Sequence, residues 1–367
     1  MKVKFKIIPH TLQFRFEAGT SRGSFTEKET WFIQASQVFD NSYFGLGEAS
    51  PLKGLSIDYS ENYQDQLKSF LDRISDEDIP ESFEEILHFV NENIPAHFPS
   101  IRFGLETALI DLVNGGKRLI FDNDFYSAKR RIPINGLVWM GDEDFMSTQI
   151  EEKLKAGFDT IKMKVGAIHF EQELALLRSI RKSYTAHDIT LRVDANGAFD
   201  ETNVHQRLEE LASLEIHSIE QPIRPQQIDL MRELSASGIL PIALDEELIG
   251  VNTLAAKKEL LVQMQPQYII LKPSLIGGIQ STREWIQLAE EKGIGWWMTS
   301  MLESNVGLNA IAQFTTQFEE LLPQGLGTGQ LYHNNIESPL EIRKGELLYN
   351  KPSVWGFNDL IKREGID

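Results

Sequence analysis

The feature that most constrains this chain is a repeated alternation of short apolar runs and longer amphipathic segments after residue 131. The short runs have the length of β-strands, and the segments between them have the apolar spacing of helices, most clearly at 171–181 and 279–291. Candidate strands lie at 132–138, 160–165, 189–193, 218–220, 242–245, 268–272, 294–299 and 324–327. Strands spaced about 25 to 30 residues apart in this number predict an α/β fold with a closed barrel of the (β/α)8 type.

The first 125 residues follow a different pattern. Alternating apolar and polar residues at 2–8, 31–37 and 43–48 predict an antiparallel sheet, and helical spacing follows at 59–74, 82–94 and 100–114. A chain of 367 residues is long enough for a barrel of about 250 residues and a second domain. We therefore predict an α+β domain at 1–125, a barrel at 126–337 and a tail at 338–367 that returns to the first domain.

Composition excludes several classes of protein. No apolar run approaches the roughly 20 residues that a membrane span needs, and the opening segment MKVKFKIIPH lacks a signal-peptide core, so we expect a cytoplasmic protein. A net charge of −18 argues against nucleic acid as a partner and leaves an oligomer possible. Because the chain has no cysteine, a metal would have oxygen or imidazole ligands, which favours hard cations.

Charged and amide side chains stand at the carboxyl ends of successive candidate strands. These residues are Lys162 and Lys164 on the second strand, Asp194 and Asn196 on the third, Glu220 on the fourth, Asp245 on the fifth and Lys272 on the sixth. Barrel enzymes place their active sites at this end. A solvated strand tip or a helix cap explains any one of these residues, but charged side chains rarely fill barrel interiors in series.

Neighbouring strands bring three of the carboxylates together. Asp194, Glu220 and Asp245 lie on consecutive strands, so their side chains can converge in a barrel that follows chain order. Converged carboxylates repel one another unless a cation lies between them. An all-oxygen set of this kind suits octahedral Mg²⁺, with Mn²⁺ as a substitute.

The lysines predict proton transfer beside that metal. Lys162 and Lys164 share one face of their strand, and the sixth strand, which carries Lys272, lies across the barrel from them. The metal would neutralise charge on an enediolate while a lysine removes the proton next to a carboxylate. Repulsion from the ammonium of Lys162 is expected to help Lys164 act as the base.

These residues resemble those of the enolase superfamily, in its muconate-lactonizing-enzyme-like branch. The matching segments are 160–164 (TIKMK), 193–197 (VDANG), 219–222 (IEQP), 244–246 (LDE) and 271–273 (LKP). The resemblance implies an N-terminal α+β capping domain and a C-terminal (β/α)7β barrel. It implies Mg²⁺ on Asp194, Glu220 and Asp245. It also implies that Lys164 is the base, that Lys162 assists it and that Lys272 faces it.

Within the branch, segments 133–139 and 325–336 look like those of o-succinylbenzoate synthases, lyases that dehydrate a cyclohexadiene carboxylate in menaquinone biosynthesis. The substrate is then a small-molecule carboxylate. Loops of the first domain would close over its succinyl tail. Candidate substrate contacts are Arg22 and Lys53 on those loops, and Asn196, Ser300, Gly327 and Thr328 on the barrel.

Other readings of the same residues remain open. Two opposed lysines also suit a racemase of N-succinyl or N-acyl amino acids or a dipeptide epimerase, although the Asp-x-Asp that dipeptide epimerases of this branch carry is absent at 325–329. Muconate cycloisomerisation is a third reaction. A metal-stabilised binding barrel without catalysis would explain the carboxylates but not the lysines on both sides of them.

Overall fold

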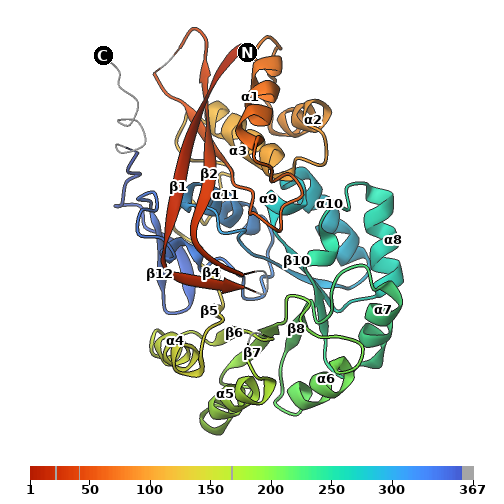
Figure 1. The fold of residues 1–367 in the computed structure, drawn as a ribbon. Coiled ribbons are helices and arrows are strands. Elements are labelled where there is room, and N and C mark those ends of the chain that lie inside the picture. Colours follow the sequence, from red (N-terminus) through yellow and green to blue (C-terminus); the bar gives the residue numbers. More distant parts are fainter. Residues whose placement is uncertain (21–22, 41, 167, 358–367) are drawn as a thin grey trace.

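The computed structural model describes residues 1–20, 23–40, 42–166 and 168–357 (Figure 1). The chain begins with an antiparallel sheet in the order β1, β2, β3. Its strands are β1 (Val3–Thr20), β2 (Gly23–Gln37) and β3 (Gly45–Ala49). The helices α1 (Tyr63–Ile74), α2 (Phe83–Asn93) and α3 (Pro99–Val113) follow, close to the predicted helical ranges. The predicted α+β character of this part is confirmed.

Strand β3 packs closely against helix α3, and glycine makes this contact possible. A Cβ atom added at Gly47 would lie 1.9 Å from the carbonyl oxygen of Gly104. Because no real side chain tolerates such a distance, only glycine lets the two backbones approach in this way. Helix α3 is buried along most of its length, so it lies between the sheet and the barrel.

The barrel strands are parallel and follow chain order. They are β5 (Gly136–Val138), β6 (Thr160–Lys164), β7 (Thr190–Asp194), β8 (Ser218–Glu220), β9 (Ile242–Leu244), β10 (Tyr268–Leu271) and β11 (Gly295–Met298). The intervening helices are α4 (Glu143–Lys155), α5 (Phe170–Ser183), α6 (Val204–Ala212), α7 (Ile228–Ser237), α8 (Leu254–Met264), α9 (Pro273–Ile276), α10 (Gly278–Glu291) and α11 (Asn305–Thr315). Short 3₁₀ turns occur at η1 (Glu246–Leu248) and η2 (Thr328–Gln330).

The eighth strand is shorter than the predicted 324–327. Gln324 forms a parallel bridge with Ile134, and Gly325 forms one with Thr299. The Gln324 side chain also accepts a hydrogen bond from the backbone N–H of Met298 at 2.7 Å. These contacts close the ring between β11 and the entrance to β5, so the predicted (β/α)7β barrel with its N-terminal α+β partner is confirmed.

The chain after the barrel contacts both parts of the molecule. The hairpin of β12 (Leu340–Arg343) and β13 (Glu346–Tyr349) pairs with β4 (Ile132–Pro133), a short strand that precedes β5. Further on, the ring of Phe357 contacts that of Phe44 in the N-terminal part, and Trp355 stacks on Phe357. The domain boundary at 125 and 126, and the assignment of the tail to the first domain, stay predictions.

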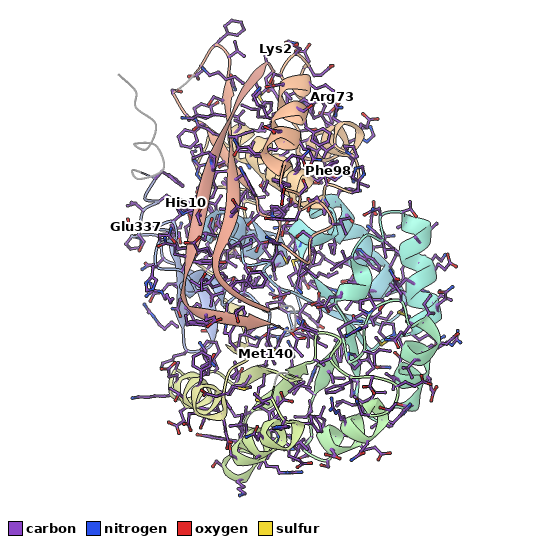
Figure 2. The ribbon with its side chains drawn as sticks, in the orientation of Figure 1. Lys2, His10, Arg73, Phe98, Met140 and Glu337 are labelled. Atoms are coloured by element: carbon purple, nitrogen blue, oxygen red, sulfur yellow. The ribbon has the colours of Figure 1, made fainter. Side chains whose placement is uncertain are left out.

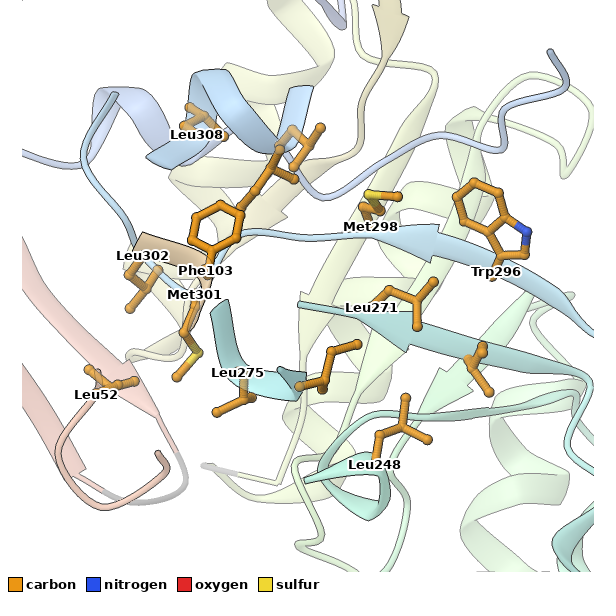
Figure 3. Packing of buried hydrophobic residues seen from close by; sticks show 14 of the residues in the cluster. Leu52, Phe103, Leu248, Leu271, Leu275, Trp296, Met298, Met301, Leu302 and Leu308 are labelled. Carbon is orange, nitrogen blue, oxygen red and sulfur yellow. The ribbon is translucent and has the colours of Figure 1, made fainter. Parts of the chain in front are cut away.

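One hydrophobic core runs from the N-terminal part into the barrel (Figure 3). It joins Phe103 of α3 to Leu275 of α9 and to Leu271 on β10. Leu52 and Leu302 lie at its edge in Figure 3, on loops from the two different parts.

The β1–β2 hairpin reaches the end of the barrel. Figure 2 labels Met140, which lies where the hairpin meets the segment after β5, and Gly19 forms an antiparallel bridge with it. Phe14 forms a second bridge, with Tyr332. Within the described ranges, no helix combines the length and apolar character needed to span a bilayer.

Candidate active site

Strand β6 alternates between the core and the barrel interior. Ile161 and Met163 belong to the hydrophobic core, while Lys162 and Lys164 face the interior and are each only 8% exposed. The period of two along a strand produces this division. Two ammonium groups therefore enter the barrel from one strand.

The neighbouring strands place carboxylates beside these lysines. In the parallel register, Lys164 lies opposite Asp194 of β7, which in turn lies opposite Glu220 of β8. The Nζ of Lys162 lies 2.6 Å from Oε2 of Glu220 and 2.9 Å from Oδ2 of Asp194. The Nζ of Lys164 lies 3.1 Å from the same Asp194 oxygen and donates to Oδ1 of Asn196 at 2.6 Å.

Three hydrogen bonds help to hold Asn196 in place. Its backbone N–H donates to Oδ1 of Asp194 at 3.1 Å, and its Nδ2 donates to Oε1 of Glu246 at 3.0 Å. The third bond is the one that it accepts from Lys164. Its φ of 42° places it in the left-handed region, which asparagine tolerates better than most residues. This turn directs the amide oxygen toward Lys164.

A second ion pair lies farther along the barrel. Lys272 directly follows β10, and its ammonium contacts Oδ2 of Asp245. Asp245 is 2% exposed. Burial opposes the charge on Lys272, but the carboxylates of Asp245 and Glu220 outweigh it and raise the pKa of Lys272 above its usual value.

Burial and neighbouring charges shift the pKa values of Lys162 and Asp194 in opposite directions. Burial opposes the ammonium form of Lys162, but Asp194 and Glu220 outweigh it, so the pKa of Lys162 is raised. Burial would raise the pKa of Asp194, but Lys162 and Lys164 hold it well below its usual range. Burial and the charge of Asp194 raise the pKa of Glu220 to about 8. Asp194 is therefore the carboxylate that the two lysines compensate most completely.

These groups line a cavity of about 310 Å³ between the barrel and the N-terminal loops. The predicted site residues that line it are Lys53, Lys162, Lys164, Asp194, Asn196, Glu220, Lys272, Ser300, Gly327 and Thr328. Asp245 is not among the lining residues, but its carboxylate contacts the ammonium of Lys272, which lines the cavity. Arg22 lies outside the described residues. The remaining wall is largely apolar, with contributions from both parts of the molecule, including Leu52, Trp139 and Met301.

The carboxylates have the donor chemistry of a hard-cation site. Oε1 of Glu220 is buried and has no hydrogen-bond partner among the described residues, so one acceptor position is open. Lysines contact one oxygen of each of the three carboxylates. Within the described ranges, no three His, Asp or Glu side chains are arranged closely enough to hold an ion. Asp194, Glu220 and Asp245 fit a divalent cation that competes with these ammonium groups.

Comparison with known proteins identifies the family. A family model described as "Enolase C-terminal domain-like" matches residues 146–352, more than half of the chain. The o-succinylbenzoate synthase of Desulfotalea psychrophila is 44% identical over 357 residues, which cover 92% of this chain and 96% of that protein. This chain belongs to the enolase superfamily. The predicted resemblance is thereby confirmed.

Solved structures of the superfamily agree with the fold. The crystal structure of MenC from Desulfotalea psychrophila matches with a TM-score of 0.84 and 41% identity, covering 95% of this chain and 100% of that one. The dipeptide epimerase of Enterococcus faecalis, solved with Mg and L-Leu-L-Tyr, has a TM-score of 0.82 over 95% of this chain and 97% of that one. At 21% identity it shows the shared fold alone. The chain is an enolase-superfamily enzyme and a homologue of o-succinylbenzoate synthase.

Sequence reasoning missed one residue that lines the cavity, Glu246, and one that contacts its wall, Arg192. Glu246 lines the cavity and holds Asn196, and its position directly after Asp245 was the available signal. Arg192 lies two residues before Asp194 on the same face of β7. Its guanidinium carbon lies 3.9 Å from the ring centroid of Trp297, which lines the cavity. An arginine inside a strand gives no sign of such a partner in sequence.

Proposed function

We propose that this enzyme abstracts the proton next to a substrate carboxylate and dehydrates its substrate to o-succinylbenzoate, in the manner of its 44% identical homologue. One observation carries the proposal. The amino groups of Lys164 and Lys272 line one cavity together with the carboxylates of Asp194 and Glu220. Removal of an α-proton needs a base on one side and charge stabilisation around it, and this arrangement provides both.

Lys164 is the proposed base. In neutral form its amino group takes the α-proton, and the resulting ammonium returns that proton to the departing hydroxyl on the same face. The C–H and C–O bonds break, a ring double bond forms and water leaves. Asn196 accepts a hydrogen bond from Lys164 at 2.6 Å, so it orients the amino group before the substrate arrives.

Lys162 and Lys272 supply fixed positive charge. Both side chains are at most 12% exposed, and in the described structure carboxylates raise the pKa of each above its usual value. Lys272 would stabilise the negative charge that develops on the substrate, from the side opposite Lys164. Lys162 would keep a positive charge beside the base.

Asp194, Glu220 and Asp245 would hold Mg²⁺, or Mn²⁺ in its place. When bound, the cation neutralises the negative charge that builds up on the substrate carboxylate. Glu220 offers an oxygen that no described residue uses. Binding would release the lysine contacts of these carboxylates, which would leave the ammonium groups available to an anionic substrate.

The remaining cavity walls would hold the rest of the substrate. Ser300, Gly327 and Thr328 would contact it from the barrel, and Lys53 from the first domain. Oγ1 of Thr328 is buried without a hydrogen-bond partner among the described residues, so it is a candidate donor to a substrate oxygen. Arg22 keeps its proposed role in closing over the succinyl tail.

The proposal implies a cytoplasmic enzyme of menaquinone biosynthesis with a small-molecule carboxylate as its partner. The net charge of −18 argues against nucleic acid as a partner, and a small anionic substrate would need a local positive site. Whether the protein forms an oligomer does not enter the reaction.

The direct test is to incubate the purified protein with the o-succinylbenzoate precursor and to follow aromatisation by ultraviolet absorbance. We expect turnover with Mg²⁺, its loss with EDTA and its recovery when excess Mg²⁺ or Mn²⁺ is added. Lys68→Ala, on the exposed face of α1, is the control and should match the wild type, since Lys68 contacts only Asp72 in the described structure. No aromatisation under any of these conditions would reject the proposed reaction.

Racemisation of N-succinyl amino acids is the second candidate. Lys164 and Lys272 line the same cavity, which favours racemisation, because two amino groups can exchange an α-proton on either face of the substrate. Incubation in D₂O with N-succinyl amino acids distinguishes the two reactions. Dehydration as the sole activity predicts slow α-proton exchange without inversion, whereas fast exchange with efficient inversion would establish a racemase.

A further inference from the structure

A buried lysine on strand β2 connects the two walls of the cavity. Lys28 is 3% exposed, although it is not among the residues that line the cavity in the described structure. Its ammonium donates to the carbonyl of Ser50 at 3.1 Å, to the hydroxyl of Ser50 and to the carbonyl of Leu302 at 3.0 Å. Ser50 belongs to the N-terminal part and Leu302 to the barrel, so one amino group bonds both.

Both partners lead directly into the cavity. Leu52 lines it two residues after Ser50, and Leu302 lines it itself together with Met301. Figure 3 shows Leu52 on one of these loops and Met301 and Leu302 on the other, and all three line the cavity. Lys28 therefore bonds to one loop that leads to the cavity wall of the first domain and to another that belongs to the barrel wall.

The barrel loop needs this support because its backbone is strained. Leu302 has a φ of 63°, a left-handed conformation that is unfavourable for a branched residue. Its carbonyl oxygen accepts from Lys28 and, at 2.7 Å, from the hydroxyl of Tyr332. On the other side, Oε2 of Glu303 accepts from the N–H of Met301 at 2.7 Å.

Burying the ammonium is costly, which argues for a function beyond packing. Burial lowers the pKa of Lys28 to about 8, and the carboxylates of Glu303 and Glu48 oppose that shift. A hydrophobic residue in this place would avoid the desolvation cost. A donor with three acceptors on two domains provides what a hydrophobic residue cannot, namely a fixed geometry between them.

We infer that Lys28 is a positioning residue, which sets the width of the substrate cavity by holding loop 50–55 of the first domain to loop 300–302 of the barrel. It acts through Ser50 and Leu302 and does not touch the reacting atoms. The inference rests on the proposed function only in naming the substrate. Its effect on the two loops is independent of the reaction.

The test compares Lys28→Met with Lys257→Met. Lys257 is also fully buried, and its ammonium also has three acceptors, but it joins α8 to α10 away from the cavity. For Lys28→Met we expect KM for the precursor to rise about tenfold with a smaller fall in kcat, because the walls bind parts of the substrate remote from the reaction. For Lys257→Met we expect unchanged KM, since loss of folded protein lowers only the active fraction.

Hydrogen exchange supplies a readout that needs no substrate. Peptides that cover 50–55 and 300–304 should both exchange faster in Lys28→Met than in the wild type or in Lys257→Met. If Lys28→Met does not fold, Tyr332→Phe removes the other donor to Leu302 and should raise KM about threefold. Unchanged exchange in both loops, or an equal rise of KM in Lys257→Met, would overturn the inference. Inactivity of the wild type would reject the proposed reaction instead, and the exchange result would still decide the role of Lys28.

Discussion

Two lysines on one face of β6 have different partners, and this difference separates their roles. The amino group of Lys162 contacts two carboxylates, those of Asp194 and Glu220, which together raise its pKa. The amino group of Lys164 contacts one carboxylate and the neutral amide of Asn196. These contacts favour the ammonium form of Lys162 in the described structure. This difference in partners supports the proposal that Lys164, and not Lys162, is the base.

Replacing Lys164 with alanine should abolish turnover and spare the metal site. We expect kcat for dehydration to fall by about 10²- to 10⁴-fold, the usual contribution of a general base. Mg²⁺ binding should stay within a few-fold of the wild type, because the three proposed ligands remain. Steady-state kinetics and calorimetric Mg²⁺ titration measure the two effects. Turnover like that of the wild type would remove Lys164 from its proposed role.

Asp194→Asn should instead weaken Mg²⁺ binding. The variant loses one proposed anionic ligand and the carboxylate that Lys162 and Lys164 share. We expect the dissociation constant for Mg²⁺ to rise more than about tenfold, since even outer contacts of a metal site are worth that much. Asp65→Asn, at an exposed position of α1, is the matched control. An unchanged calorimetric titration for Asp194→Asn would contradict the ligand assignment.

At the scale of single residues, the sequence correctly predicted which central side chains share a face and which lie side by side. The period of two put Lys162 and Lys164 on one face, and parallel register put Asp194 beside Glu220. It could not reveal that Glu246 holds Asn196, because that contact depends on a left-handed turn after β7. Nor could it find Lys28, whose acceptors lie 22 and 274 residues away.

At the scale of elements, local patterns found strands but not all of their partners. The predicted strand 132–138 divides into β4 and β5, because β4 leaves the barrel ladder to pair with β13. That partner lies more than 200 residues away, and no local pattern encodes it. The eighth strand is reduced to Gln324 and Gly325, where side-chain and bridge contacts replace a regular ladder. Helix ranges were predicted more closely, since caps and 3.6-residue spacing are local.

Helix α3 offers a pH test at this scale. Glu106 of α3 is fully buried and accepts a hydrogen bond from the N–H of Ile279, in the first turn of α10, at 2.6 Å. Burial raises the pKa of Glu106 from 4.5 to about 8. The folded protein therefore keeps this proton between about pH 5 and 8, while the unfolded chain loses it. The free energy of unfolding should fall as pH rises through this window, and level off above it.

Glu106→Gln removes this pH dependence. We expect the melting temperature of the variant, relative to the wild type, to increase between pH 5 and 8, corresponding to an effect on the order of a few kcal/mol at most. Glu77→Gln, at an exposed carboxyl, should show no such trend. Thermal denaturation across the pH range measures both. Parallel curves for wild type and Glu106→Gln would show that Glu106 does not titrate in this window.

At the scale of the whole molecule, the two parts are joined by polar contacts as well as by the core. Glu48 of β3 is fully buried and accepts from the N–H of Ser304 at 2.8 Å and from the N–H of Gly307 at 2.9 Å. It thereby caps α11 of the barrel with a carboxylate from the N-terminal sheet, where the helix dipole favours negative charge. Thr30 of the neighbouring strand donates to the same carboxylate at 2.9 Å.

Because these contacts join the two parts, we predict that the molecule unfolds in a single transition, although proteins of two domains often do not. Separation of the parts would expose the core around Phe103 and break the hydrogen bonds from the N–H groups of Ser304 and Gly307 to Glu48. Glu48→Gln should lower the melting temperature by several degrees, since hydrogen bonds to a charged group are worth about 1.5 to 3 kcal/mol each. Calorimetry should show one peak in both proteins, with equal calorimetric and van't Hoff enthalpies. If Glu48→Gln shifted only one of two resolved peaks, the parts would be independent folding units, and the cavity between them would depend on their docking.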